Sequence, residues 1–382
     1  MASPGVHRRF RLFRDARVWI ALAVVGALLV IAAGVVWLVW YPSYANSCQG
    51  PGCVALGETS SSGSPSDTMS PGDATATPTS SPIASASAVA TPSASPKTSP
   101  KPGIPPGRTG KCPSLSACGF PDASNTGPTI TSFTQRTGNA TIRQDGQVIS
   151  GWDLRMGMLD IYANNVTVTQ CKILSNGWWG INLRPGYSGL KITYCDIHAA
   201  VGQGPDGPGK GSDYAVSNMS SSSIEVGWND IAGFGNALSM SSGNIHDNYV
   251  HDLPTFINAG GEWQHVDAII SGGDDTRGLT IRHNTLLNSA AHNRGGTAAI
   301  GLFPDNGVVS NTLIQDNWLA GGAYAVYGGS NGANGIRVIN NVFSTEYWPN
   351  CGYYGPVAHW NAGGAGNVWS GNVTSEGKAV NP

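Results

Sequence analysis

Side chains suited to acid–base chemistry occur close together in the second half of the chain. Glu262-Trp-Gln-His-Val-Asp267 holds a histidine and a carboxylate, and His292-Asn-Arg294 adds a second histidine and an arginine. A carboxylate that moves a proton, a histidine that exchanges it and an arginine that stabilises negative charge would suit a reaction on a sugar acid. The candidate catalytic residues are therefore Asp267, His265, His292 and Arg294. The alternative is that Asp267 caps a loop and that the other three are ordinary loop residues.

Aromatic residues occur in the same region and in similar stretches of the chain. Aromatic faces stack against the C–H surfaces of sugars, so these residues could form a saccharide platform; the alternative is that they pack loops against the body of the protein. The candidate substrate-binding residues are Trp178, Trp179, Trp263, Tyr347, Trp348, Tyr353 and Tyr354.

Charge limits the cofactors and partners. From residue 128 onward the chain has 12 Lys and Arg against 18 Asp and Glu, a net charge of −6. Nucleic acid requires a basic face and is therefore not expected as a partner. The adjacent acids Asp274 and Asp275 could hold calcium through loop oxygens, although a solvated turn is the simpler interpretation. The sequence identifies no other cofactor.

A short repeated unit must position these residues. Gly278-Leu-Thr-Ile-Arg-His-Asn-Thr-Leu-Leu287 alternates apolar and polar residues, reaches a turn at Asn284 and leaves by another apolar step. Copies of this period-two unit recur along the chain with inserts of variable length between them, which predicts a β-solenoid. An Asn at the same turn of each coil can then form a hydrogen bond with the Asn of the next coil. The predicted turn column is Cys171, Cys195, Asn229, Asn248, Asn284, Asn317, Asn341 and Asn372.

This pattern resembles the right-handed parallel β-helix family, which includes pectate lyases and polygalacturonases, over about residues 128–382. Each coil should have three short strands, and the third should begin near a small residue in several coils. The long inserts before the third strand (199–213, 252–266, 288–297 and 344–355) would form one groove wall. In the resembled family this face binds saccharides.

The resemblance also bears on catalysis. His265-Val-Asp-Ala-Ile269 resembles a polygalacturonase stretch in which Asp267 would be the carried-over carboxylate. However, Ala298 and Ala299 stand where that family has an acidic pair, and two carboxylates are needed for ordinary glycoside hydrolysis. Lyase-type or epimerase-type chemistry is therefore favoured over hydrolysis.

The residues before the solenoid have three different compositions. Residues 1–17 are basic, and residues 18–40 are uncharged and apolar over a length that would cross a bilayer as a helix. We expect a signal anchor with a cytoplasmic N-terminus, with a cleaved signal peptide as the alternative. Residues 41–111, rich in Ser, Thr and Pro, predict a disordered extracellular linker, and residues 112–127 a cap region.

Seven cysteines in an exported chain favour disulfides. The local pairs would be Cys48 with Cys53 and Cys112 with Cys118. Cys171 and Cys195 occupy successive turns and could be either a disulfide or two buried thiols, and Cys351 is left over.

Two functional hypotheses follow. The first is a membrane-anchored extracellular enzyme that binds a polysaccharide or cell-wall glycan and cleaves or modifies it. The second is a non-catalytic glycan-binding or structural solenoid at the cell surface.

Overall fold

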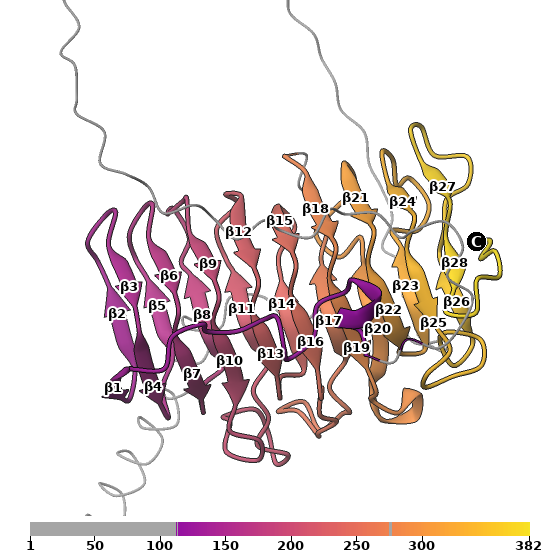
Figure 1. Ribbon diagram of the computed structural model, residues 1–382. Coiled ribbons are helices and arrows are strands. Elements are labelled where there is room, and N and C mark those ends of the chain that lie inside the picture. The colour runs from indigo at the N-terminus through magenta and orange to yellow at the C-terminus, as the bar shows by residue number, and fades with distance from the viewer. Residues whose placement is uncertain (1–111, 113, 275–276) are drawn as a thin grey trace, which may run out of the picture. The chain divides into compact units, whose positions relative to one another are not determined.

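The computed structural model describes residues 112, 114–274 and 277–382. From β1 onward, these residues form a parallel β-helix in which the chain passes through sheets A, B and C in turn (Figure 1). The predicted β-solenoid is confirmed, and its three parallel sheets are consistent with the right-handed form. The segments predicted as the basic tail, the anchor and the linker lie outside the described residues. Within the described part of the chain, no helix is long and apolar enough to cross a membrane.

Sheet A follows the predicted turn column and has ten strands. They are β1 (Thr134–Thr137), β4 (Trp152–Arg155), β7 (Lys172–Ser175), β10 (Asp196–Ala199), β13 (Asp230–Ala232), β16 (Tyr249–His251), β19 (Thr285–Asn288), β22 (Trp318–Gly321), β25 (Val342–Ser344) and β28 (Val373–Thr374).

Sheet B contains the predicted third strand of each coil. Its nine strands are β2 (Ala140–Ile142), β5 (Leu159–Ile161), β8 (Trp179–Leu183), β11 (Tyr214–Asn218), β14 (Asn236–Ser239), β17 (Val266–Ser271), β20 (Gly296–Leu302), β23 (Tyr324–Gly328) and β26 (Gly355–Ala358). The long inserts connect sheet A to this sheet, as the sequence predicted.

Sheet C completes each coil and leads into the turn. Its strands are β3 (Val148–Ser150), β6 (Thr167–Thr169), β9 (Lys191–Thr193), β12 (Ile224–Gly227), β15 (Gly243–His246), β18 (Leu279–Arg282), β21 (Thr312–Gln315), β24 (Arg337–Ile339) and β27 (Val368–Ser370). In β18, Leu279 and Ile281 are buried while Thr280 is partly exposed, which is the alternation expected when one face of a strand covers a core.

The turn between sheets C and A sets the register of the coils. In it, a residue with positive φ, such as His283 (φ 54), is followed by a fully buried ladder residue, such as Asn284. The Asn284 Nδ2 donates to Asn317 Oδ1 (3.0 Å) and to the carbonyl of Ile245 (3.0 Å). Equivalent amide–amide bonds link each asparagine of the predicted column to the next, from Asn229 to Asn372. The predicted ladder is confirmed.

Cysteines occupy the first two positions of the ladder as free thiols. The main-chain N–H of Cys171 donates to Cys195 Sγ (3.4 Å), so this sulfur stands where later coils have an amide oxygen. Cys351 is also a buried free thiol. The predicted disulfide between Cys112 and Cys118 is present, whereas the proposed Cys48–Cys53 pair lies outside the described residues.

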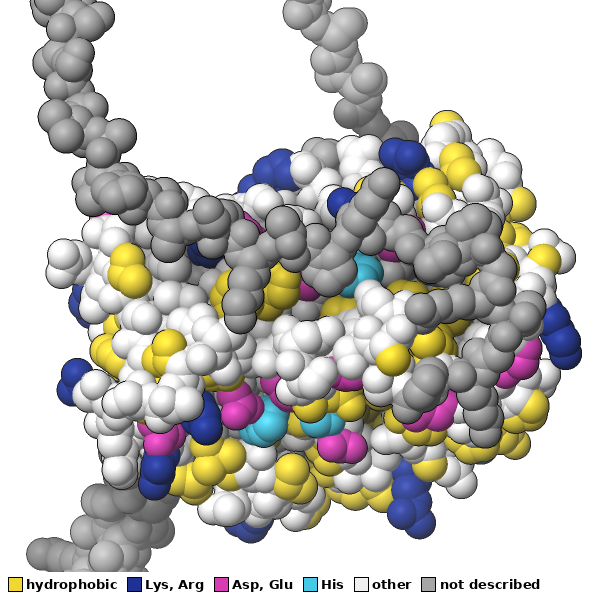
Figure 2. All heavy atoms as spheres, in the orientation of Figure 1, with side chains coloured by type: hydrophobic (Ala, Val, Ile, Leu, Met, Phe, Trp, Pro, Cys, Tyr) yellow, Lys and Arg dark blue, Asp and Glu magenta, His cyan; other side chains and the backbone are white. Residues whose placement is uncertain are grey.

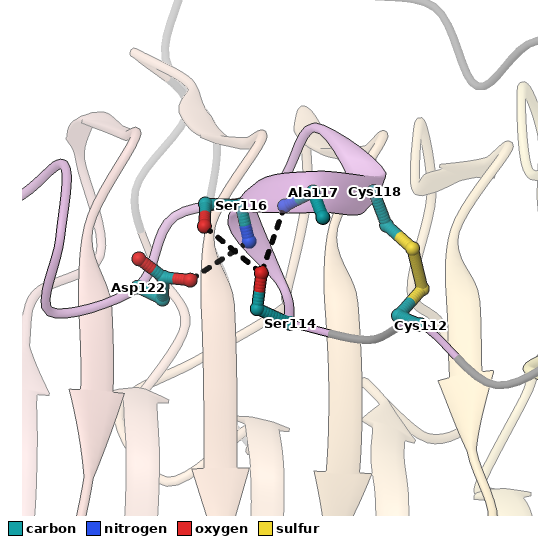
Figure 3. The surroundings of a disulfide bond; sticks show 6 residues. All are labelled: Cys112, Ser114, Ser116, Ala117, Cys118 and Asp122. Carbon is teal, nitrogen blue, oxygen red and sulfur yellow. Dashed lines mark hydrogen bonds between the residues drawn. A yellow bond between two sulfur atoms is a disulfide. The ribbon is translucent and has the colours of Figure 1, made fainter.

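Residues 114–127 run along the side of the coils, past sheet A (Figure 1). The short helix η1 (Ser116–Cys118) is held by the Cys112–Cys118 disulfide at its last residue and by a hydrogen bond at its first. In that bond, Asp122 Oδ2 accepts from the main-chain N–H of Ser116 (2.8 Å; Figure 3). Phe120 then packs edge-on against Trp318 (5.3 Å between ring centroids). The segment therefore covers part of the outer surface near β22.

Candidate functional site

Asp267 lies on the outer side of sheet B but is fully buried. Ile300 and Leu302 face inward, so Gly301 between them faces outward. The Asp267 Oδ1 lies against Gly301, and the ring of Phe303 covers the same glycine. Neither carboxyl oxygen makes a hydrogen bond of good geometry among the described residues. Burial raises the pKa of Asp267 well above its usual range, and this effect exceeds that of the nearby Ala298 N–H, which favours the charged form. Burial therefore favours the neutral form of this carboxyl group.

The other predicted catalytic residues have separate partners. Arg294 lies over the Trp263 ring (5.6 Å), and His292 stacks on Tyr353 (3.4 Å between centroids). His265 is exposed. Within the described residues, no hydrogen bond or ion pair joins any of these three side chains to Asp267. The structure therefore brings His292 and Arg294 onto one short helix, η2 (His292–Arg294), without connecting them to the carboxyl group.

An aromatic strip crosses the last coils of the same face. We define it as Phe303, Tyr324, Tyr327, Trp348, Tyr353 and Tyr354. Successive ring centroids are 5.2 Å apart for Phe303 and Tyr327, 5.5 Å for Tyr327 and Tyr324, and 5.6 Å for Tyr324 and Tyr354. Tyr354 is 61% exposed and Tyr353 40% exposed. The strip combines flat apolar faces with several phenol hydroxyls.

The remaining predicted aromatic residues lie outside this strip. Trp179, on β8, donates from Nε1 to Asp160 Oδ1 (3.1 Å) and lies beneath Arg184. Trp178 is half-buried, and its carbonyl accepts from the Tyr214 N–H (3.0 Å). Tyr347 packs toward a different apolar cluster, the one that contains Trp318 and the disulfide. Sequence spacing alone therefore grouped residues that the inserts separate.

Two buried carboxyl groups join neighbouring inserts. Burial and the charge of Asp206 raise the pKa of Asp213 to about 8, so Asp213 is mostly protonated at pH 7. Asp213 Oδ1 also accepts from Gln264 Nε2 (3.1 Å), and Asp206 Oδ1 accepts from the main-chain N–H of Ala259 (2.7 Å). These contacts tie insert 199–213 to insert 252–266.

The sequence interpretation missed a histidine–carboxylate cluster on sheet A. Nε2 of His198 and Nε2 of His251 lie 3.0 Å and 2.9 Å from the same atom, Asp230 Oδ1. On the face shown in Figure 2, histidine and acidic side chains lie side by side below the middle of the solenoid. Despite burial, contacts with Asp196 and Asp230 raise the pKa of His198 to about 9, and the histidines lower the pKa of Asp230 to about 2.

A signal for this cluster was present in the ladder column. Asp196 and Asp230 each follow a ladder residue directly, at the first position of their sheet A strands, and His198 and His251 lie two positions further on. Because alternate residues of a strand face the same side, these offsets place all four side chains on one outer surface.

The predicted calcium site has only one described residue. Asp274 is exposed and its main-chain N–H donates to the carbonyl of Val308 (3.0 Å), while Asp275 lies outside the described residues. Calcium at this turn remains a prediction.

Comparisons with protein-family models, with curated proteins and with solved structures found no match to this chain. The class of protein is therefore defined by its architecture, a parallel β-helix with long inserts beside one sheet.

Proposed function

We propose that the protein binds a polysaccharide or cell-wall glycan along the aromatic strip on sheet B. The observation that carries this proposal is the exposure of Tyr353 and Tyr354 next to the strand residues Tyr324 and Tyr327. Sugar rings stack on such faces, and phenol hydroxyls give orientation through hydrogen bonds. The resemblance to pectate-lyase-like proteins also supports a glycan on this sheet.

Charge and shape indicate the kind of glycan. The strip contains no cationic side chain, and the solenoid carries net negative charge. A neutral or weakly charged chain would bind there without repulsion, whereas a polyanion would require a bridging cation. The strip runs from coil to coil, which suits an extended polymer better than a single sugar.

Location at the cell surface forms part of the proposal. The basic tail, apolar segment and Ser/Thr/Pro-rich linker favour a single-pass membrane protein with a cytoplasmic N-terminus and an extracellular solenoid. The Cys112–Cys118 disulfide supports an oxidising compartment.

Chemical modification of the glycan is a second candidate function, supported by the unpaired carboxyl group of Asp267. A buried acid with a raised pKa can act as a general acid or base. Because the Asp267 side chain is fully buried, a substrate has no access to it in this structure, and binding without turnover is the better-supported function.

A glycan array tests both candidates. The full-length chain in mild detergent should retain one class of glycan, and the double variant Tyr353→Ala/Tyr354→Ala should lose it while keeping its melting temperature. Bound glycans should then be incubated with the protein and analysed by mass spectrometry. Equal retention by both proteins would contradict the proposed site, and a new product would support the second candidate.

A further inference from the structure

The histidine–carboxylate cluster on sheet A is built by strand register. Asp196 on β10 pairs with Asp230 on β13, and His198 is separated from His251 on β16 by Ala232. Strands are about 4.8 Å apart, so the two histidines flank the small alanine and both reach the central aspartate. Carboxylates that face each other on adjacent strands repel, and this arrangement therefore favours a cation between them.

Donor and acceptor roles point to the same conclusion. His251 Nδ1 lies 2.8 Å from Asp252 Oδ2. A carboxylate can only accept, so Nδ1 carries the proton and, in the neutral ring, Nε2 presents a lone pair. That lone pair faces Asp230 Oδ1 at 2.9 Å, which places two acceptors in contact. A second proton on the ring would relieve this contact, and so would a metal ion.

Asp196 adds a fourth group. Its Oδ1 lies 2.9 Å from His198 Nε2, yet it is inaccessible to water and has no hydrogen bond of acceptable geometry among the described residues. His198 Nε2 is thus shared between two carboxylates, at 2.9 Å and 3.0 Å. One N–H cannot satisfy both oxygens, whereas one metal ion can.

We propose that His198, Asp230 and His251 bind a divalent transition-metal ion of the zinc class, with Asp196 as the fourth ligand. One atom from each of the three principal ligands lies within 4.8 Å of the others. Ligand atoms around tetrahedral zinc lie about 3.3 Å apart, so each histidine nitrogen needs to move away from Asp230 Oδ1 by only about 0.3–0.4 Å. Two imidazoles select zinc or a neighbouring transition metal over calcium or magnesium, which prefer oxygen ligands.

Neighbouring residues orient the principal ligands. Asp252 fixes the tautomer of His251, and Tyr249 stacks on the same ring (4.2 Å between centroids). A carboxylate behind a metal-bound histidine raises its basicity and holds its orientation. The site lies on sheet A, whereas the aromatic strip lies on sheet B, so the metal proposal is independent of the glycan proposal.

The experiment uses the full-length chain in mild detergent, stripped with a chelator and dialysed. Titration with zinc chloride alone should give a 1:1 calorimetric isotherm, and cobalt chloride should give the visible absorption bands of a four-coordinate site. His198→Ala/His251→Ala should abolish both signals, Asp252→Asn should weaken zinc binding by about 10–100-fold, and His359→Ala, at an exposed histidine outside the cluster, should change neither.

X-ray absorption at the zinc edge of the wild-type complex keeps the test independent of variant folding. It should detect two imidazoles and oxygen ligands. Absence of zinc binding by the wild-type chain, sulfur ligands, or unchanged binding by a folded His198→Ala/His251→Ala variant would each overturn the proposal.

Discussion

Asn317 Oδ1 accepts two hydrogen bonds from Asn284, one from its main-chain nitrogen (2.9 Å) and one from Nδ2 (3.0 Å). Asn284 Oδ1 accepts the same pair of bonds from Asn248, at 3.0 Å and 2.9 Å. Each ladder asparagine thus donates hydrogen bonds to the asparagine of one neighbouring coil and accepts them from the asparagine of the other. Since all three residues are fully buried, the ladder fixes the register between coils.

Replacement of Asn284 by Leu should destabilise the solenoid by about 2–4 kcal/mol, because it leaves buried groups of Asn248 and Asn317 unpaired. Thermal unfolding followed by circular dichroism measures the effect. Asn244→Leu, at an exposed position of β15, is the matched control and should change stability by less than about 0.5 kcal/mol. An unchanged melting temperature for Asn284→Leu would show that the ladder contributes little.

Cys195→Asn should extend the ladder by one amide and stabilise the protein by about 0.5–1.5 kcal/mol. The new Oδ1 would replace a sulfur that accepts from Cys171 at 3.4 Å, and Nδ2 would face the carbonyl of Val168, now 3.7 Å from the sulfur. Cys195→Ala removes the acceptor and should be less stable than wild type. A lower melting temperature for Cys195→Asn than for Cys195→Ala would contradict this prediction.

Asp213 should make stability depend on pH. Its pKa is about 8 in the folded protein, against an ordinary value of 3.8 in an unfolded chain, so only the folded chain retains this proton between those values. The contribution to stability is therefore greatest below about pH 4 and declines as pH rises to about 8. Asp213→Asn mimics the protonated acid and should stabilise the protein by roughly 1–3 kcal/mol at pH 8.

Melting curves at about pH 5 and about pH 8 test this prediction. Glu262→Gln removes an exposed acid from the adjoining insert and should leave the pH dependence unchanged. If Asp213→Asn showed the same pH dependence as wild type, the pH dependence would not come from the raised pKa of Asp213.

Asp267→Asn should have little effect, because burial already favours the neutral form of this carboxyl group and the amide is neutral and of similar shape. We expect a change in unfolding free energy of less than about 1 kcal/mol and unchanged glycan affinity. If instead affinity or product formation were lost without a change in melting temperature, Asp267 would belong to the functional site. The same titrations and product assays on both proteins distinguish these outcomes.

The sequence was sufficient for the solenoid because its repeat is local. Every residue of the turn column occupies the predicted turn, and Ala215, Ala237, Ala268, Ala299 and Ala325 are all fully buried at equivalent positions of sheet B. Alternation and turn chemistry are properties of consecutive residues, so they can be recognised without knowing how the inserts fold.

The candidate site was less predictable because the path of the long inserts determines which of its side chains come together. Spacing placed Asp267 correctly on sheet B, but only the path of the chain after Gly301 brings Phe303 over that glycine, next to Asp267 Oδ1. Tyr347 faces another cluster for the same reason. The histidine–carboxylate cluster could have been predicted from the positions of its residues relative to the ladder column. His198 and Asp230 are 32 residues apart, however, and the variable inserts between coils hide this alignment in the sequence.

The proposal of glycan binding depends most directly on the exposed ring of Tyr354. Calorimetric titration of the glycan selected on the array should be compared for wild type, Tyr354→Phe and Tyr354→Ala. Loss of a stacking ring should cost about 1–2 kcal/mol, so Tyr354→Ala should bind about 5–30-fold more weakly, while Tyr354→Phe keeps most of the affinity. Wild-type affinity in a folded Tyr354→Ala variant would contradict the assignment of the aromatic strip as the binding surface.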